Sequence, residues 1–171
     1  MKKVIVIGCP GGGKSTFSRA LHEITGLPLF HLDMLKWNTD KTSVSKPIFL
    51  ERLQNVMEQD KWIIDGNYGS TMEMRMAACD TIFFLDYPTE VCIEGVISRN
   101  GKPRPDMPWI EKVGEFDEEF MKLIRNYNRD NRPKVIALLE KYADKEIVIF
   151  GSREDAAEYL QKIENGIKVT E

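Results

Sequence analysis

The sequence contains little of what builds disulfide frameworks and metal centres. Its three cysteines, Cys9, Cys79 and Cys92, are odd in number, lie far apart and form no CxxC pair. The two histidines, His22 and His31, have no neighbours in a pattern typical of metal or nucleophilic sites. Disulfide cross-links and a structural zinc centre are therefore not expected, and reduced thiols fit a cytoplasmic protein.

Long hydrophobic runs and an excess of positive charge are also missing. No stretch approaches the roughly 20 apolar residues that span a bilayer, and the apolar run 4–7 is too short for a signal peptide. The net charge is −3 and the isoelectric point is near 5.6, whereas proteins that bind duplex DNA usually have a basic surface. The sequence therefore predicts a cytoplasmic protein without a membrane segment, and a nucleic-acid partner is not expected.

What is present is typical of one folded domain. Hydrophobic residues make up 42% and charged residues 30% of the 171 residues, and no linker divides the chain. Short apolar runs alternate with helical patterns, which indicates βαβ units and a parallel sheet. Strands are expected at 4–7, 29–32, 62–64, 82–85 and 147–150, and helices at 15–25, 46–59, from 70, 89–100, 115–131, 133–142 and 152–165. Ser70 with Glu73 has the spacing of a capping box, and Ser152 is expected to cap the last helix. The predicted fold is a three-layer α/β/α sandwich with a parallel sheet of about five strands.

One motif identifies a phosphate-binding loop. Gly8-Cys-Pro-Gly-Gly-Gly-Lys14-Ser15 matches GxxxxGK[ST] and lies between a predicted strand and a predicted helix. Its glycines let successive N–H groups turn around a phosphate, Lys14 reaches the β- and γ-phosphates, and the Ser15 hydroxyl is a ligand for Mg²⁺. The chain is thus predicted to be a P-loop NTPase that uses ATP and Mg²⁺. The predicted ATP-binding residues are Gly8, Pro10, Gly11, Gly12, Gly13, Lys14, Ser15 and Thr16.

A second acid is needed to hold the metal, and two aspartates qualify. Asp65 and Asp86 each end an apolar run, and ligands of open parallel sheets gather at the carboxyl ends of the strands. We favour Asp65, because the loop that follows it, Gly66-Asn67-Tyr68-Gly69, can also meet a substrate. Motif logic alone does not separate the two.

The order of these motifs resembles that of adenylate kinase and related nucleoside monophosphate kinases, over nearly the whole chain. The segments that carry the resemblance are the P-loop, Asp33-Met-Leu-Lys36, Asp65-Gly66, Asp86-Tyr-Pro88 and a proline-broken loop at 100–109. The segments His31-Leu-Asp33, Trp37, Trp62–Tyr68 and Arg104-Pro-Asp-Met107 are closer still to bacterial P-loop proteins named "topology modulation protein". The resemblance implies a kinase that moves the γ-phosphoryl group of ATP to a small acceptor, with 100–132 as a lid-like insertion in a single domain, 1–171. The alternative is an ATP-binding regulator that acts through a partner.

The sequence departs from adenylate kinases where the acceptor would bind. No arginine follows Asp65-Gly66, and Lys36 replaces a second family arginine, although lysine cannot form a bidentate fork on a phosphate. Arg75 substitutes only if its helix aims it inward; otherwise it is a solvated charge. AMP is therefore expected to be a poor acceptor. The predicted acceptor-binding residues are Asp33, Lys36, Trp37, Asn67, Tyr68 and Arg75.

Two of these residues have alternative interpretations. Asp33 is either the group that receives the acceptor's hydroxyl proton or a helix N-cap. Trp37 either stacks on a substrate ring or packs internally.

Arginines around the loop are predicted to neutralise the transferring phosphoryl group. Arg99 ends a helix and Arg104 lies in the loop. Arg125, Arg129 and Arg132 share one helical face, and this pattern also fits a helix face that is simply exposed to solvent. The loop itself has three prolines and little to bury, so it is expected to open and close. The predicted catalytic residues are Lys14, Asp33, Arg99, Arg129 and Arg132.

Overall fold

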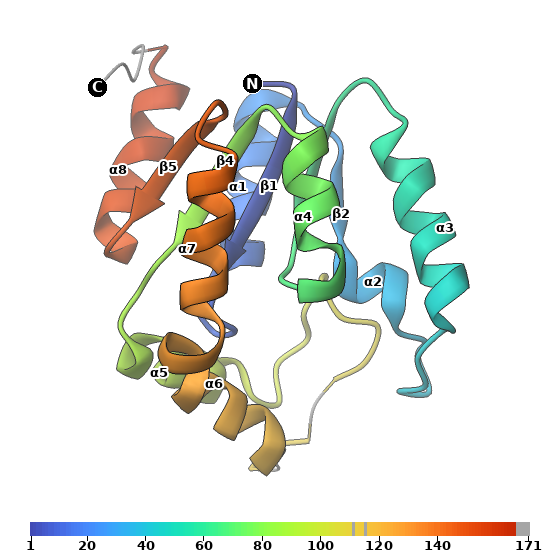
Figure 1. Ribbon diagram of the computed structural model, residues 1–171. Helices are drawn as coiled ribbons and strands as arrows, with labels where there is room; N and C mark the ends of the chain where they lie inside the picture. The colour runs from blue at the N-terminus through green and yellow to red at the C-terminus, as the bar shows by residue number, and fades with distance from the viewer. Residues whose placement is uncertain (111, 115, 167–171) are drawn as a thin grey trace.

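The computed structural model describes residues 1–110, 112–114 and 116–166. The helix start predicted near Glu115 and the C-terminal residues 167–171 lie outside these ranges. The described chain forms one sheet of five parallel strands in the order β2-β3-β1-β4-β5 (Figure 1). The strands are β1 (Lys3–Gly8), β2 (Leu29–His31), β3 (Trp62–Asp65), β4 (Thr81–Leu85) and β5 (Glu146–Phe150). The predicted α/β fold with a parallel sheet is confirmed.

The central strands are buried on both faces, which explains their near-continuous apolar sequences. Residues 4–7 of β1 are wholly inaccessible to solvent, as are residues 62–64 of β3. Each strand of a parallel sheet is covered by crossover helices, so neither set of alternating side chains meets water. Asp65, the polar residue at the end of β3, therefore follows directly on buried apolar strand residues.

Helices cover both faces of the sheet and complete the three layers (Figure 1). The helices are α1 (Lys14–Thr25), α2 (Leu32–Lys36), α3 (Lys46–Met57), α4 (Gly69–Ala78), α5 (Thr89–Arg99), α6 (Glu118–Asp130), α7 (Arg132–Lys141) and α8 (Arg153–Glu164). On one face, α1 and α8 pack with Phe17, Leu21 and Tyr159 against Phe83. On the other, α3, α4 and α7 bury residues that include Leu53, Met76, Leu139 and Phe84.

The carboxyl ends of all five strands meet at one edge of the sheet, and this edge positions the site. The P-loop follows β1, α2 follows β2, and the segment 66–68 follows β3. Helices α5 and α6 lie beyond the same edge, and the segment between them crosses it (Figure 1).

Two local expectations differ from the structure. The capping box predicted at Ser70 and Glu73 is wrong: α4 begins at Gly69, after Tyr68 in the left-handed region (φ 35°), and no side chain caps it. The tight turn that Tyr68 makes starts the helix one residue before the predicted cap. The cap predicted at Ser152 is confirmed, with Asp155 completing a capping box.

Candidate active site

The P-loop backbone adopts left-handed conformations that favour glycine. Gly13 (φ 88°) precedes α1 in the left-handed region, and no side chain caps the first N–H groups of that helix. A β-carbon at Gly11 (φ 84°) would collide with the carbonyl of Cys92 on α5. The loop therefore presents backbone donors and the positive end of α1 to the strand edge, which suits a phosphate group.

Lys14 and Asn67 both contact the start of this loop. The Lys14 amine donates to the carbonyl oxygens of Gly8 (2.9 Å) and Cys9 (3.1 Å). Burial lowers the pKa of Lys14, although the carboxylate of Asp65 acts in the opposite direction. The Asn67 side chain accepts from the Gly8 N–H (3.2 Å) and donates to the Gly8 carbonyl (2.7 Å). Asn67 thus joins the segment after β3 to the P-loop.

Asp65 presents one unpartnered oxygen beside the P-loop. It is 3% exposed, and its Oδ1 accepts a hydrogen bond from His31 Nδ1 (2.8 Å). Burial acts to lower the pKa of His31, but the hydrogen bond with Asp65 and the negative charges of Asp65 and Asp106 together outweigh this and raise it. Oδ2 of Asp65 is buried and has no hydrogen-bond partner among the described residues. A buried carboxylate oxygen without a partner is costly, so this atom fits a metal ion or a metal-bound water.

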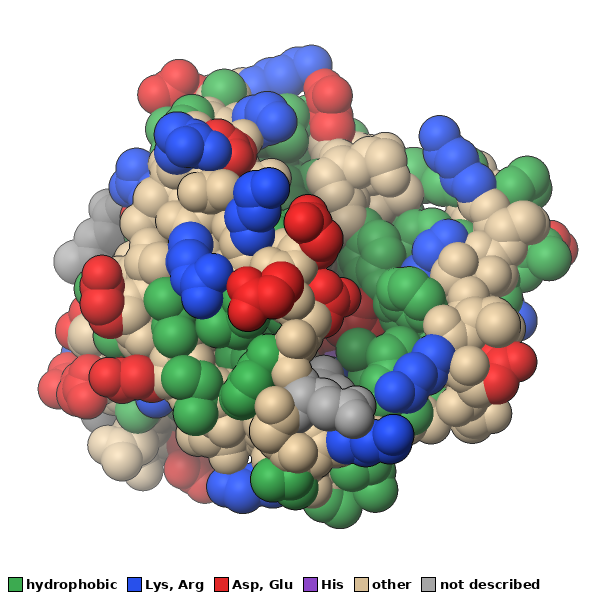
Figure 2. Space-filling model, turned by 90° about the horizontal axis from the view of Figure 1, so that it is seen from below, with side chains coloured by type: hydrophobic (Ala, Val, Ile, Leu, Met, Phe, Trp, Pro, Cys, Tyr) green, Lys and Arg blue, Asp and Glu red, His purple; other side chains and the backbone are tan. Residues whose placement is uncertain are grey.

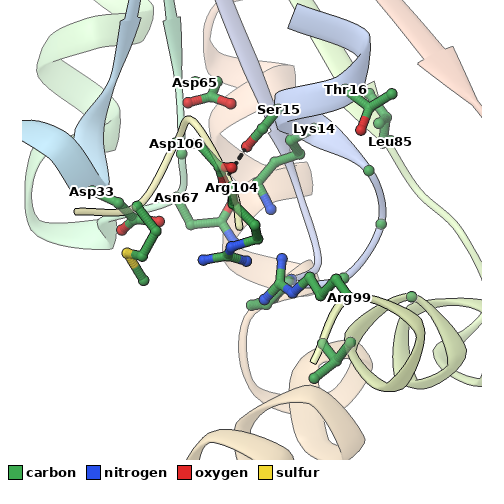
Figure 3. A pocket seen from close by; sticks show the side chains of 18 of the residues that line it. Lys14, Ser15, Thr16, Asp33, Asp65, Asn67, Leu85, Arg99, Arg104 and Asp106 are labelled. Carbon is green, nitrogen blue, oxygen red and sulfur yellow. Dashed lines mark hydrogen bonds between the residues drawn. The ribbon is translucent and has the colours of Figure 1, made fainter. Parts of the chain in front are cut away.

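The donors around Asp65 suit Mg²⁺ in particular. Figure 3 shows the carboxylate of Asp65 on the same side of the site as the hydroxyl of Ser15. No group of three or more His, Cys, Asp or Glu side chains within the described ranges could hold a metal by itself. Mg²⁺ needs no such cage, because it commonly uses one or two carboxylates, waters and the phosphates of a substrate.

Asp86, the alternative acid, has a different neighbour. It accepts two hydrogen bonds from Arg132 Nε, at 2.8 and 3.0 Å, and a third from Nη2 at 2.7 Å. This ion pair joins the end of β4 to the start of α7. Asp65 lines the cleft at the strand edge, whereas Asp86 and Arg132 lie outside its lining.

The predicted arginines separate into two groups. Arg99 and Arg104 line the cleft, and both point toward the region in front of Lys14 (Figure 3). Nη1 of Arg104 is buried and makes no hydrogen bond in the part of the chain that the structure describes. Arg129 lies away from the cleft, with its side chain 72% exposed and paired with the neighbouring Asp130. Arg125 likewise pairs at the surface, with Glu118. The structure therefore does not bring Arg125, Arg129 and Arg132 to the phosphate-binding loop.

A hydrogen-bonded set of side chains faces the other part of the cleft. The Tyr68 hydroxyl donates to Asp33 Oδ1 (2.7 Å) and accepts from Trp37 Nε1 (3.0 Å). Burial raises the pKa of Asp33, and the hydrogen bond from Tyr68 partly offsets this. Trp37 also meets Trp109 edge to face, with ring centroids 5.5 Å apart. All four line the cleft, so an acceptor entering here would meet a carboxylate between aromatic walls.

Two predicted acceptor contacts do not reach the cleft. Arg75 is fully buried, and its guanidinium donates to the backbone carbonyls of Gly66 (2.9 Å) and Asn67. Lys36 donates to the Val44 carbonyl (2.8 Å) and lies over the Phe49 ring. Arg75 is neither solvated nor aimed at a substrate: it holds the segment that carries Asn67 and Tyr68.

The cleft is large enough for two ligands. Its volume is about 1860 Å³, above the range usual for the site of one small molecule. Figure 2 looks onto this end of the molecule and shows it hollowed, with hydrophobic, basic and acidic side chains around the hollow.

Sequence reasoning missed two residues of the site, His31 and Asp106. His31 ends β2 beside the end of β3, where it is paired in register with Asp65. The sequence could have indicated this contact, because pairing β2 with β3 places His31 beside Asp65. Asp106, in the segment between α5 and α6, accepts a hydrogen bond from the Ser15 hydroxyl (2.9 Å) and is 6% exposed. Its contact spans 91 residues of sequence and had no local signal. The expectation that loop 100–109 has little to bury is wrong at this residue.

Comparisons with known proteins identify the fold. No family model matches the sequence, and no curated protein matches it. A shikimate kinase from Acinetobacter baumannii in complex with shikimate is 16% identical, with a TM-score of 0.61 over 99% of this chain and 96% of that one. A gluconokinase from Sinorhizobium meliloti 1021 is 15% identical (TM-score 0.58; 97% and 91% covered). A shikimate kinase from Bacteroides thetaiotaomicron is 19% identical (TM-score 0.55; 97% and 98% covered).

The chain therefore has the same fold as these two shikimate kinases and this gluconokinase. At identities this low the likeness shows the fold alone. No sequence match supports the closer resemblance to topology modulation proteins. Among the described helices, none has the length and apolar character needed to cross a membrane.

Proposed function

We propose that the protein is an ATP-dependent kinase that transfers the γ-phosphoryl group to a small hydroxylated acceptor. The observation that carries the proposal is that one continuous cleft joins the P-loop to the set formed by Asp33, Tyr68 and Trp37. The structural neighbours, two shikimate kinases and a gluconokinase, support the same class of reaction. AMP remains a poor acceptor in this proposal, because Arg75 and Lys36 are bonded to backbone carbonyls.

Each group of residues in the site has a separate role in the proposed reaction. The backbone of Gly8–Gly13 and the start of α1 bind the phosphates of ATP, and Thr16, in the first turn of α1, lines the same cleft. Lys14, Arg99 and Arg104 stabilise the charge that spreads over the transferring group. Ser15 and Asp65 would hold Mg²⁺, which supplies neutralising charge when bound. Asp33 accepts the proton of the acceptor hydroxyl, and burial raises its pKa as a base requires.

A screen of acceptors tests the proposal. ADP release is followed across sugars, hydroxy acids, nucleosides and nucleotides with Mg²⁺ and ATP, and a hydroxylated, non-phosphorylated acceptor is expected to raise it most. Conversion of AMP at the rate of an ordinary adenylate kinase would show that the inferred acceptor class is wrong. ATP binding without transfer to any acceptor would favour the alternative, a nucleotide-dependent regulator that acts through a partner.

The role of Asp33 gives a pH-dependent prediction. The hydrogen bond from Tyr68 lowers the pKa of Asp33, so Tyr68→Phe should raise that pKa. A base with a higher pKa is protonated at higher pH, and the acidic limb of the kcat/KM profile should therefore move to higher pH. Trp37→Phe is the control, because it keeps the bond between Tyr68 and Asp33. An acidic limb that stays in place in Tyr68→Phe would remove Asp33 from the role of base.

A further inference from the structure

The contact between Asp106 and Ser15 brings a second carboxylate to the P-loop. Besides accepting from the Ser15 hydroxyl at 2.9 Å, Asp106 has its Oδ1 3.9 Å from the guanidinium of Arg19. Ser15 and Arg19 are four residues apart in α1, so they present one face of the helix to Asp106. Figure 3 shows Asp106 next to Ser15, with Asp65 on the same side of the site.

Asp106 is 6% exposed, and it is one of two buried acidic side chains on this side of the site (Figure 3). Asp65, 3% exposed, adds the unpartnered buried oxygen Oδ2. Asp106 therefore accepts from the hydroxyl that follows the P-loop lysine, and the carboxylate of Asp65 lies on the same side of the site (Figure 3). This is unfavourable for the phosphates of ATP unless a cation lies between them.

We propose that Asp106 is a lid-borne ligand of the Mg²⁺ that Ser15 and Asp65 hold, so that lid closure and metal binding stabilise each other. Two carboxylates, a hydroxyl and substrate phosphates form a usual donor set for Mg²⁺. Because the lid supplies one ligand, Mg²⁺ binds the closed arrangement better than the open one, and binding and closure are reciprocally coupled. This inference rests on the proposed function.

A distinctive consequence is that Asp106 should act in opposite directions on two forms of the nucleotide. With Mg²⁺ its carboxylate favours binding; without metal it repels the phosphates. Asp106→Asn keeps the size of the side chain and an oxygen for the Ser15 hydroxyl. It should weaken binding of Mg²⁺·AMPPNP about 10- to 100-fold, the usual loss when a group that supports a metal site is removed. Binding of AMPPNP in EDTA should become several-fold tighter.

The experiment is calorimetric titration with AMPPNP, with and without Mg²⁺, which requires no acceptor. Glu94→Gln on the exposed side of α5 is the matched control, because it removes the same charge outside the cleft and should change neither affinity. Asp106→Ala, which leaves no amide, should show the same pair of shifts and guards against an effect peculiar to asparagine. Circular dichroism confirms that each variant is folded.

The outcomes are distinguishable. Tighter binding of both forms in Asp106→Asn would mean that Asp106 blocks the site rather than holding metal, and would overturn the inference. Unchanged affinities in both Asp106 variants would overturn it as well, while leaving the proposed function intact. A wild-type protein that binds AMPPNP under neither condition would instead overturn the proposed function.

Discussion

Lys14→Ala is expected to reduce phosphoryl transfer from ATP by about 10²–10³-fold, the loss typical of removing one preorganised donor from a developing charge. The Lys14 amine is held by the carbonyls of Gly8 and Cys9 at the mouth of the P-loop, so it is positioned before ATP arrives. Preorganised charge of this kind costs no rearrangement when the transferring group becomes more anionic. Both kcat and the affinity for Mg²⁺·ATP should fall, because a lysine on the β- and γ-phosphates binds the ground state and binds the more anionic transition state more strongly.

The substitution should spare the fold. The Lys14 amine donates to the loop carbonyls of Gly8 and Cys9, and the sheet beneath is covered by apolar side chains from α1 and α8. Lys122→Ala, an exposed position of α6 outside the cleft, is the control for loss of a lysine. Kinetics are compared at equal folded content, measured by circular dichroism. Undiminished transfer by Lys14→Ala would remove the P-loop from the reaction, and with it the proposed kinase.

The P-loop could be predicted from sequence because its signal is local. Eight consecutive residues, Gly8–Ser15, fix both the backbone and the donors, and the neighbouring strand and helix are marked by their own periodicity. The strands were predictable for a related reason: in a parallel sheet covered on both faces, each central strand reads as an uninterrupted apolar run. Placing Asp65 at the strand edge followed directly from that pattern.

The arginines could not be assigned in this way, because their partners are distant in sequence. The local sequence around Arg132 fits a phosphate-binding arginine. In the structure, however, Arg132 donates a hydrogen bond to Asp86, a carboxylate 46 residues away. Arg75 lies on a short helix whose local pattern left its direction open, and the loop carbonyls beside it fix its burial. Whether a cation faces solvent, a carboxylate or a ligand depends on tertiary distances, which helical periodicity does not encode.

The comparison of the two strand-end aspartates follows from these neighbours. Asp65→Asn should lower kcat/KM by about 100-fold and raise the Mg²⁺ concentration needed for half-maximal activity, because the metal loses a carboxylate. The variant keeps the oxygen that accepts from His31 Nδ1, so the packing around residue 65 should change little. Asp86→Asn should keep most of the activity, because Asp86 faces Arg132 outside the cleft.

Asp86→Asn should instead show its effect in stability. The Arg132 side chain is 42% exposed, so solvent screens the pair and its loss should cost no more than about 1 kcal/mol, measurable by urea unfolding. The two variants thus differ in the property that they change: Asp65→Asn changes the Mg²⁺ dependence strongly, whereas Asp86→Asn changes stability slightly and the Mg²⁺ dependence little. A greater loss of activity in Asp86→Asn at equal folded content would move the metal-holding acid to the end of β4. The unpartnered oxygen of Asp65 would then have to be satisfied by water alone.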